Sequence, residues 1–269
     1  FTPTVMSNTI SQETPSHQSI PLSFSASFIM RSRQLLGWSL FLVLVTILLT
    51  WFGFLFTTGL LDEVTGSFFS NPPAADSIWG WTKYFGWAAG KWVFLIVSRI
   101  IAFFLAFLAA YSLSAPLYVF LSTAAEKKFS GEHFEADEGF TVRGVLKDLL
   151  EGIKIGVFGI LVTVVALIIS FAPLIGQAAV FLLYVFYSTL MFIDYPASRR
   201  RWSLGRKIGW ISRHGSLSFR LGFLPAVISM IPVLNMFLIA LLFPLLTVHA
   251  TLNFYKIENG SHSPPVSRT

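Results

Sequence analysis

Cysteine is absent from this 269-residue chain, and charged residues are scarce. The absence of cysteine excludes disulfide bonds and metal sites built from thiolates. Asp, Glu, Lys and Arg make up only 12% of the residues, against about 25% in an average soluble domain, which excludes an ordinary water-soluble fold. A nucleophile elbow, a zinc-binding H-E-x-x-H sequence and a phosphate-binding loop are also missing. We therefore expect a protein that is not an enzyme and that holds no cofactor and no metal ion.

Hydrophobic residues, in contrast, make up 54% of the chain and include 28 Phe and 8 Trp. Residues 35–61 run for 27 positions without a charge. As a helix this segment is about 40 Å long, which exceeds the hydrocarbon core of a bilayer at about 30 Å. Residues 92–121 contain a single charge, Arg99. Both segments are predicted to be transmembrane helices, within one all-α integral membrane domain that covers residues 23–257.

Two further hydrophobic stretches, residues 155–193 and 221–254, are each interrupted by a proline. The two arms of the first stretch are 17 residues each, about 25 Å as helix and therefore short of a full crossing. Proline cannot continue the helical hydrogen bonds, and Gly and Asn tolerate left-handed backbone. These properties predict a helical hairpin in each stretch, with turns marked by Pro173 and Gly176 and by Pro232 and Asn235.

The two turns contain almost only apolar residues. A turn that emerges into water usually carries polar residues, so we expect the hairpin tips to be buried in protein at membrane depth, where irregular backbone is tolerated. The alternative is a set of ordinary short spans joined by tight loops. The preferred architecture is two long transmembrane helices plus two proline-turned, partially inserted helical hairpins.

The distribution of basic residues predicts the orientation. The formal net charge is +6, and sixteen of the 19 Lys and Arg lie before the first span, within residues 122–154 or 194–220, or near the end of the chain. The positive-inside rule places these regions in the cytoplasm, with both termini inside and the loop at residues 62–91 outside. We attribute the positive charge to this orientation and expect no binding of nucleic acid. Residues 1–22 and 258–269 are polar and are predicted to be disordered tails.

Three arginines are candidates for binding an anion. Arg31 and Arg33 precede the first span; cations there are commonly topology signals, but with the free amides at a helix start they also suit an oxyanion. Arg99 lies inside a span and near a stripe of small residues that ends at Ser114, so it is expected to face protein. It either pairs or reaches the outer interface, or it attracts anions.

The other polar residues of interest have structural interpretations. The basic run at residues 199–201 is predicted to contact lipid headgroups, and Asp194 is expected to pair with that run or with Lys207. His249 is expected to form a hydrogen bond with a neighbouring helix, and Glu126 is expected to belong to a solvated acidic face.

Three short sequences, in this order, resemble the family of the CysZ sulfate permeases and the related etoposide-induced membrane proteins. They are Tyr-Ser-Leu-Ser-Ala-Pro-Leu at residues 111–117, Phe-Ile-Asp-Tyr-Pro-Ala at 192–197, and the segment 221–235. The resemblance implies two long transmembrane helices, two partially inserted hairpins, assembly into homo-oligomers and contact with membrane lipids. It also implies sulfate uptake across the bacterial inner membrane, feeding cysteine synthesis. The family's oxyanion site lies at the start of its first helix, where Arg31 and Arg33 stand here, without the usual Gly-Leu before them.

Two hypotheses of function follow. The first is a transporter or channel for sulfate or a related oxyanion, in which Arg31, Arg33 and Arg99 bind or attract the anion. The second is a membrane scaffold that transports nothing and binds partner proteins through its basic cytoplasmic loop.

Overall fold

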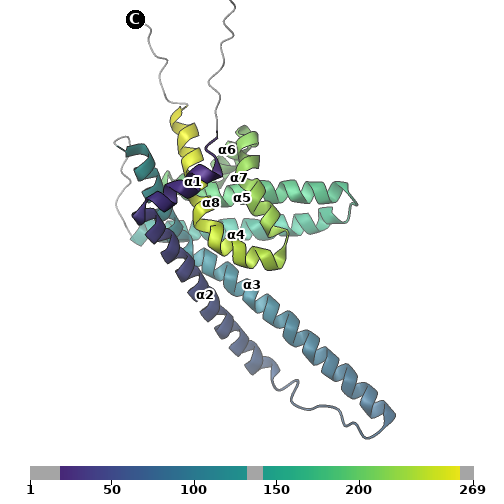
Figure 1. Ribbon diagram of the computed structural model, residues 1–269. Coiled ribbons are helices and arrows are strands. Elements are labelled where there is room, and N and C mark those ends of the chain that lie inside the picture. Colours follow the sequence, from purple (N-terminus) through teal and green to yellow (C-terminus); the bar gives the residue numbers. More distant parts are fainter. Residues whose placement is uncertain (1–18, 132–141, 261–269) are drawn as a thin grey trace, which may run out of the picture.

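The computed structural model describes residues 19–131 and 142–260, and all of their regular secondary structure is helical. The helices are α1 (Leu22–Arg31), α2 (Arg33–Thr65), α3 (Ile78–Ser130), α4 (Val142–Ser170), α5 (Ile175–Arg199), α6 (Leu204–Arg213), α7 (Gly215–Ser229) and α8 (Pro232–Gly260). Five of them, α2, α3, α4, α5 and α8, are long and apolar enough to cross a membrane. The prediction of an all-α, multi-pass membrane protein is confirmed. The described chain begins and ends on the same side of the molecule (Figure 1).

Helices α2 and α3 form a long antiparallel pair that extends away from the other helices (Figure 1). Small residues allow the two backbones to approach: a Cβ atom on Gly53 of α2 would lie 3.1 Å from the Cβ atom of Ala106. The expected stripe on α3 is buried along its length, at Ala102, Ala106, Ala110 and Ser114. Helix α3 is 53 residues long and exceeds its apolar segment at both ends. It begins after Ser77, whose hydroxyl caps the helix by accepting a hydrogen bond from the amide of Gly80.

Helices α4 and α5 form the first hairpin, which projects to one side of the α2–α3 pair (Figure 1). The turn differs from the prediction, because Gly176 is not its left-handed residue. Leu174 has the positive φ of 63°, and the amide of Ile175 donates to the carbonyl of Pro173 at 2.7 Å, which makes a γ-turn. Gly176 is needed for a different reason: a Cβ atom there would lie 2.2 Å from the carbonyl oxygen of Ile169. A glycine at this position lets the two arms meet.

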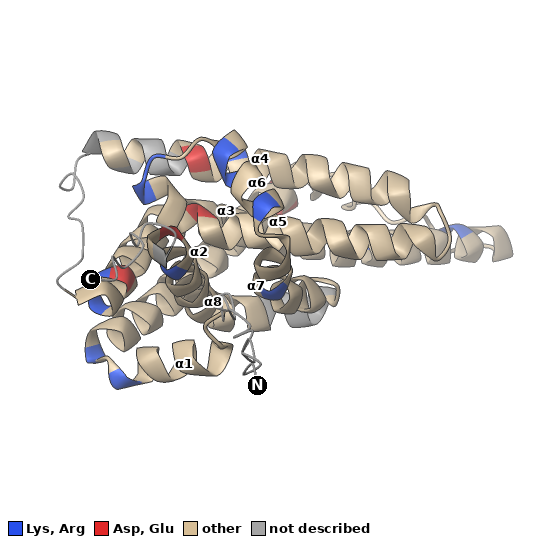
Figure 2. Ribbon diagram, turned by 90° about the horizontal axis from the view of Figure 1, so that it is seen from above, with Lys and Arg blue, Asp and Glu red and all other residues tan. Residues whose placement is uncertain are grey.

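Within residues 19–131 and 142–260, no segment covers the tip of the first hairpin, so the expectation that protein buries it is wrong for this part of the chain. Phe171 and Leu174 are each 87% exposed and Ile175 is 80% exposed. The hairpin projects to one side of the α2–α3 pair (Figure 1), and its arms carry no charge over most of their length (Figure 2). An apolar surface of this kind is typical of one that lipid or another protein covers.

Helices α7 and α8 form the second hairpin, joined by Met230 and Ile231. Pro232 is the first residue of α8, a position that suits proline because the amide there needs no helical partner. Asn235 lies in the first turn of α8 and not in the connection that we predicted it would mark. Helix α7 has 15 residues, about 22 Å, so this arm is too short to cross a bilayer core of about 30 Å.

The core lies where α3, α5 and α8 meet. Phe243 of α8 is at its centre, with ring centroids 4.6 Å from Tyr111, 4.7 Å from Tyr118 and 4.7 Å from Phe192. Burial of such rings contributes hydrophobic free energy, and their tilted contacts add to it. This cluster fixes the second hairpin against the first and against α3.

Replacing Gly222 by alanine is expected to destabilise the protein by about 1–3 kcal/mol. A Cβ atom at this position of α7 would lie 1.9 Å from the carbonyl oxygen of Val185 and 2.4 Å from Oγ1 of Thr189, both on α5. A backbone carbonyl cannot rotate away, so the helices must separate. The control is Gly156→Ala in α4, where a Cβ atom meets nothing within 4 Å and alanine should be neutral or stabilising. Equal unfolding midpoints of the two variants in detergent would contradict the close contact.

Candidate functional site

The first candidate site is the junction between α1 and α2. Helix α1 ends at Arg31 and α2 begins at Arg33, and between them Ser32 has an extended backbone with φ of −108°. The Oγ atom of Ser32 accepts a hydrogen bond from the amide of Leu35 at 3.4 Å, so serine caps α2. Ser32 and Leu35 are buried, whereas the two arginines on either side of the cap are exposed. Arg31 and Arg33 therefore lie on either side of the start of α2, and their role in binding an anion stays a prediction.

Contacts with α8 hold α1 in place. The side chain of Asn253 forms two hydrogen bonds with the backbone of Ile20. Its Oδ1 atom accepts from the Ile20 amide at 2.8 Å, and its Nδ2 atom donates to the Ile20 carbonyl at 3.3 Å. The Oγ atom of Ser25 lies 3.0 Å from Nδ1 of His249. The expectation that His249 bonds to a neighbouring helix is confirmed. These contacts fix the direction from which α1 reaches the junction.

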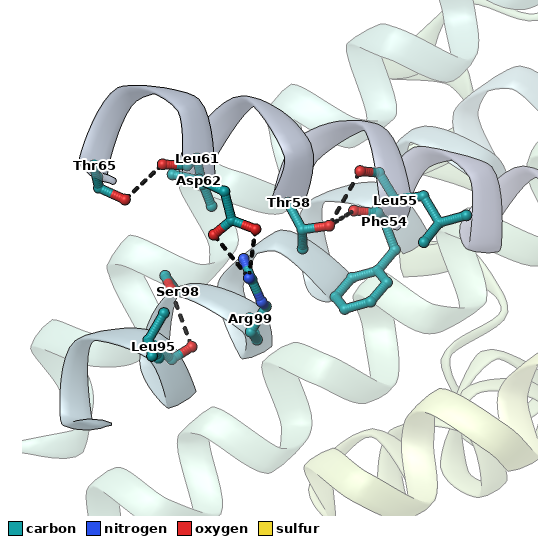
Figure 3. A network of polar contacts seen from close by, with 9 residues as sticks. All are labelled: Phe54, Leu55, Thr58, Leu61, Asp62, Thr65, Leu95, Ser98 and Arg99. Atoms are coloured by element: carbon teal, nitrogen blue, oxygen red, sulfur yellow. Dashed lines mark hydrogen bonds and ion pairs between the residues drawn. The ribbon is translucent and has the colours of Figure 1, made fainter. Parts of the chain in front are cut away.

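Arg99 lies far from this junction. Its Nη2 atom donates to both carboxylate oxygens of Asp62, at 2.8 Å each (Figure 3). Asp62 is 29 positions after Arg33 on α2, about 44 Å away along the helix axis. The side chains of the pair are 35% and 56% exposed. Of the interpretations that the sequence left open, the structure shows pairing, and the partner Asp62 was not anticipated.

A buried ion-pair cluster joins α3 to the end of α5, where we expected a lipid-binding run and a solvated acidic face. Oε1 of Glu126 accepts from Nη2 of Arg199 at 2.5 Å and from Nη2 of Arg200 at 3.1 Å. The side chain of Glu126 is 2% exposed, that of Arg199 6% and that of Arg200 23%. Both expectations are wrong for these residues, because the fold turns the arginines inward onto Glu126. The other acidic residues of that face, 132–138, lie outside the described residues.

The end of α5 directs these arginines. The amide of Trp202 donates to the carbonyl of Ala197 at 3.1 Å, and the amide of Arg201 donates to that of Ser198 at 2.8 Å. With φ of 53° at Arg201, this is a Schellman motif with arginine at the position that glycine usually takes. Arg199 therefore belongs to the last helical turn, where a cation is also favourable for the helix dipole.

A second buried pair connects α5 to α6. Nζ of Lys207 donates to Oδ1 of Asp194 at 2.5 Å and to Oγ of Ser198 at 3.0 Å, and Ser198 in turn donates to Asp194 at 2.9 Å. The side chain of Lys207 is fully buried. Of the two partners that we expected for Asp194, the structure selects Lys207. Among the described residues, no group of three or more His, Asp or Glu is arranged to hold a metal ion.

Comparison with known proteins agrees with the resemblance seen in the sequence. A protein-family model described as sulfate transporter CysZ/etoposide-induced protein 2.4 matches residues 22–240. A search of curated proteins found no match. The matched segment covers most of the chain and includes the α1–α2 junction, the first hairpin, and the second hairpin as far as residue 240 in α8. The chain therefore belongs to the sulfate transporter CysZ/etoposide-induced protein 2.4 family.

Proposed function

We propose that this protein moves sulfate or a closely related oxyanion across the bacterial inner membrane, and that the sulfur feeds cysteine synthesis. The observation that carries the proposal is the α1–α2 junction, where Arg31 and Arg33 flank the capped start of a transmembrane helix. Membership of the family supports the substrate. The positive-inside rule supports a cytoplasmic location for the junction and for both ends of the chain.

The junction has the groups that a dianion requires. Two exposed guanidinium groups supply charge and paired N–H donors. The first amides of α2, those of Arg33 and Gln34, have no carbonyl to bond within their own helix, and the positive end of the helix dipole lies at the same point. Arg99 has a smaller role in the proposal, because the carboxylate of Asp62 offsets its charge.

The exposed hairpin tip suits a route between subunits. In an oligomer of this protein, Phe171, Leu174 and Ile175 of one copy would lie against another copy. They would line the route of the anion within the membrane. This would cover the apolar surface that the single chain leaves open and would tolerate the irregular backbone at Leu174.

The scaffold hypothesis is less well supported. It needs a basic loop that is free to meet partner proteins, but Arg199 and Arg200 point onto Glu126, and Lys207 points onto Asp194. These cations hold helices together inside the protein.

Replacing Arg31 and Arg33 together by glutamine is expected to reduce sulfate flux at least about tenfold. Each charge-assisted contact contributes about 1.5–3 kcal/mol, and 1.4 kcal/mol corresponds to a factor of ten. The measurement is uptake of radiolabelled sulfate into proteoliposomes that contain the purified protein. The matched control is Lys83→Gln with Lys128→Gln, which removes two exposed charges elsewhere. If the arginine variant retains the flux of the control, the site is elsewhere, and a wild-type flux no greater than that of empty liposomes would contradict transport itself.

A further inference from the structure

A second basic site lies at the opposite end of α1 from the junction. It is a pocket of about 420 Å³ between the start of α7, the last turns of α8 and Ser19. Ser19 lies three positions before the start of α1. Its size is within the range of pockets that hold small molecules. The pocket is lined by Ser19 and Lys256, which lie near the two ends of the described chain. These ends lie on one side of the molecule (Figure 1), and the orientation proposed above places that side in the cytoplasm.

The lining of the pocket is basic. It includes Arg213, His214, Arg220 and Lys256 and no aspartate or glutamate. The cations come from separate elements: Arg213 ends α6, Arg220 belongs to α7 and Lys256 to α8. Three permanent positive charges around one cavity raise the local concentration of anions. Because they converge from three elements, their arrangement depends on the tertiary fold and is not that of a solvated helix face.

Two of the lining groups are held in place. Nη1 of Arg220 donates to Oγ of Ser19 at 3.0 Å. Nδ1 of His214 lies 3.0 Å from the carbonyl oxygen of Trp210. Since a carbonyl only accepts, Nδ1 carries a proton, and Nε2 of the neutral ring is then an acceptor, so His214 shapes the pocket without donating to an anion. The guanidinium group of Arg220 is oriented by its bond to Ser19, and its other N–H groups would be the donors that an anion meets.

The floor of the pocket adds backbone donors. Gly215, Ser216 and Leu217 line it and form the first turn of α7. Helix α7 has no side-chain cap, and the helix dipole favours a negative charge at its first turn.

We propose that this pocket binds a tetrahedral oxyanion group, a phosphate or sulfate, carried either by a soluble anion or by an anionic lipid headgroup. The site is distinct from the α1–α2 junction, because the whole of α1 lies between them, and its 9 positions from Leu22 to Arg31 correspond to about 14 Å. It does not rest on the transport proposal, since none of its residues belongs to the junction.

The test uses full-length protein that already carries Arg31→Gln and Arg33→Gln, so that binding at the junction does not contribute. In detergent free of phospholipid, titration calorimetry measures the binding of inorganic phosphate and of sulfate. Native mass spectrometry measures retained lipid after exposure to vesicles of phosphatidylglycerol or of phosphatidylcholine. We expect saturable binding of the inorganic ions, or selective retention of phosphatidylglycerol. The first outcome assigns the pocket to a soluble anion and the second to a lipid headgroup.

Adding Arg213→Gln and Lys256→Gln is expected to weaken that binding at least about tenfold, because two charged donors are lost. Both side chains are exposed, so the fold should survive, and Arg220 keeps its bond to Ser19. Adding Lys83→Gln and Lys128→Gln instead removes the same charge elsewhere and should leave binding unchanged. The proposal is overturned if neither ion nor lipid binds to the starting protein, or if the two pairs of substitutions have the same effect.

Discussion

Replacing Lys207 by methionine is expected to lower the free energy of unfolding by about 3–5 kcal/mol. Lys207 is fully buried and forms the ion pair with Asp194 that joins α6 to α5. Methionine has a similar length but no charge, so the variant leaves the Asp194 carboxylate buried, with the hydroxyl of Ser198 still donating to it but without its lysine. An uncompensated buried charge costs far more than the net gain from the pair itself. The measurement is the unfolding midpoint of the purified protein in detergent.

The double variant Lys207→Met with Asp194→Asn distinguishes a charge effect from a packing effect. Removal of both charges should recover most of the lost stability, because replacement of a whole buried pair is often nearly neutral. The matched control is Lys154→Met, whose lysine is 61% exposed and pairs with Glu151 on the same helix. Such a surface pair contributes about 0–1 kcal/mol. A Lys207→Met protein as stable as the Lys154→Met protein would show that Lys207 is not buried against Asp194.

Replacing Glu126 by glutamine is also expected to cost about 3–5 kcal/mol. The substitution keeps the size of the side chain and one carbonyl oxygen, but it removes the negative charge that two arginines share. Arg199 is nearly fully buried and keeps its proton, so the variant leaves a buried positive charge that has lost the Glu126 carboxylate. The end of α5 should then separate from α3, and a lower unfolding midpoint in detergent would report it.

The control for this prediction is Glu63→Gln, an exposed glutamate at the other end of the α2–α3 pair, which should be close to neutral. A second variant, Glu126→Gln with Arg199→Met, should be more stable than Glu126→Gln alone, because it removes the buried cation as well. Arg200 can remain, since its guanidinium group also lies 5.0 Å from the ring of Phe254. If the second substitution adds to the loss, the two residues are not coupled.

The long apolar helices and the turns between α4 and α5 and between α7 and α8 could be predicted because hydrophobic length and proline are local signals, whereas partial insertion of these helix pairs stays a prediction. A run of 27 residues without charge has no stable alternative to a helix in lipid. The turn residues were harder to assign, because a glycine serves two purposes that look the same in a sequence. Glycine is required at position 176 because a Cβ atom there would lie 2.2 Å from the carbonyl oxygen of Ile169. The residue with a positive φ is instead Leu174.

The ion pairs could be predicted only where the partners are close in sequence. Asp194 and Lys207 are 13 positions apart and on adjacent helices, so their pairing was one of two expected arrangements. Glu126 and Arg199 are 73 positions apart, and Arg99 and Asp62 are 37 apart on different helices. The packing of α2, α3 and α5 cannot be seen in the sequence. From the sequence alone, Glu126 is therefore predicted to be solvated with its acidic neighbours, and the arginines at 199–201 are predicted to contact lipid.

The same separation imposes an order on the synthesis of the protein. Glu126 leaves the ribosome 73 residues ahead of Arg199, and at about 5–20 residues per second the delay is about 4–15 seconds. During that time α2 and α3 are complete, but the carboxylate at the base of α3 has no arginine to meet and stays in water. The ion pairs that join α3 to the end of α5 can form only after α5 is made, so this part of the membrane domain is closed late in synthesis.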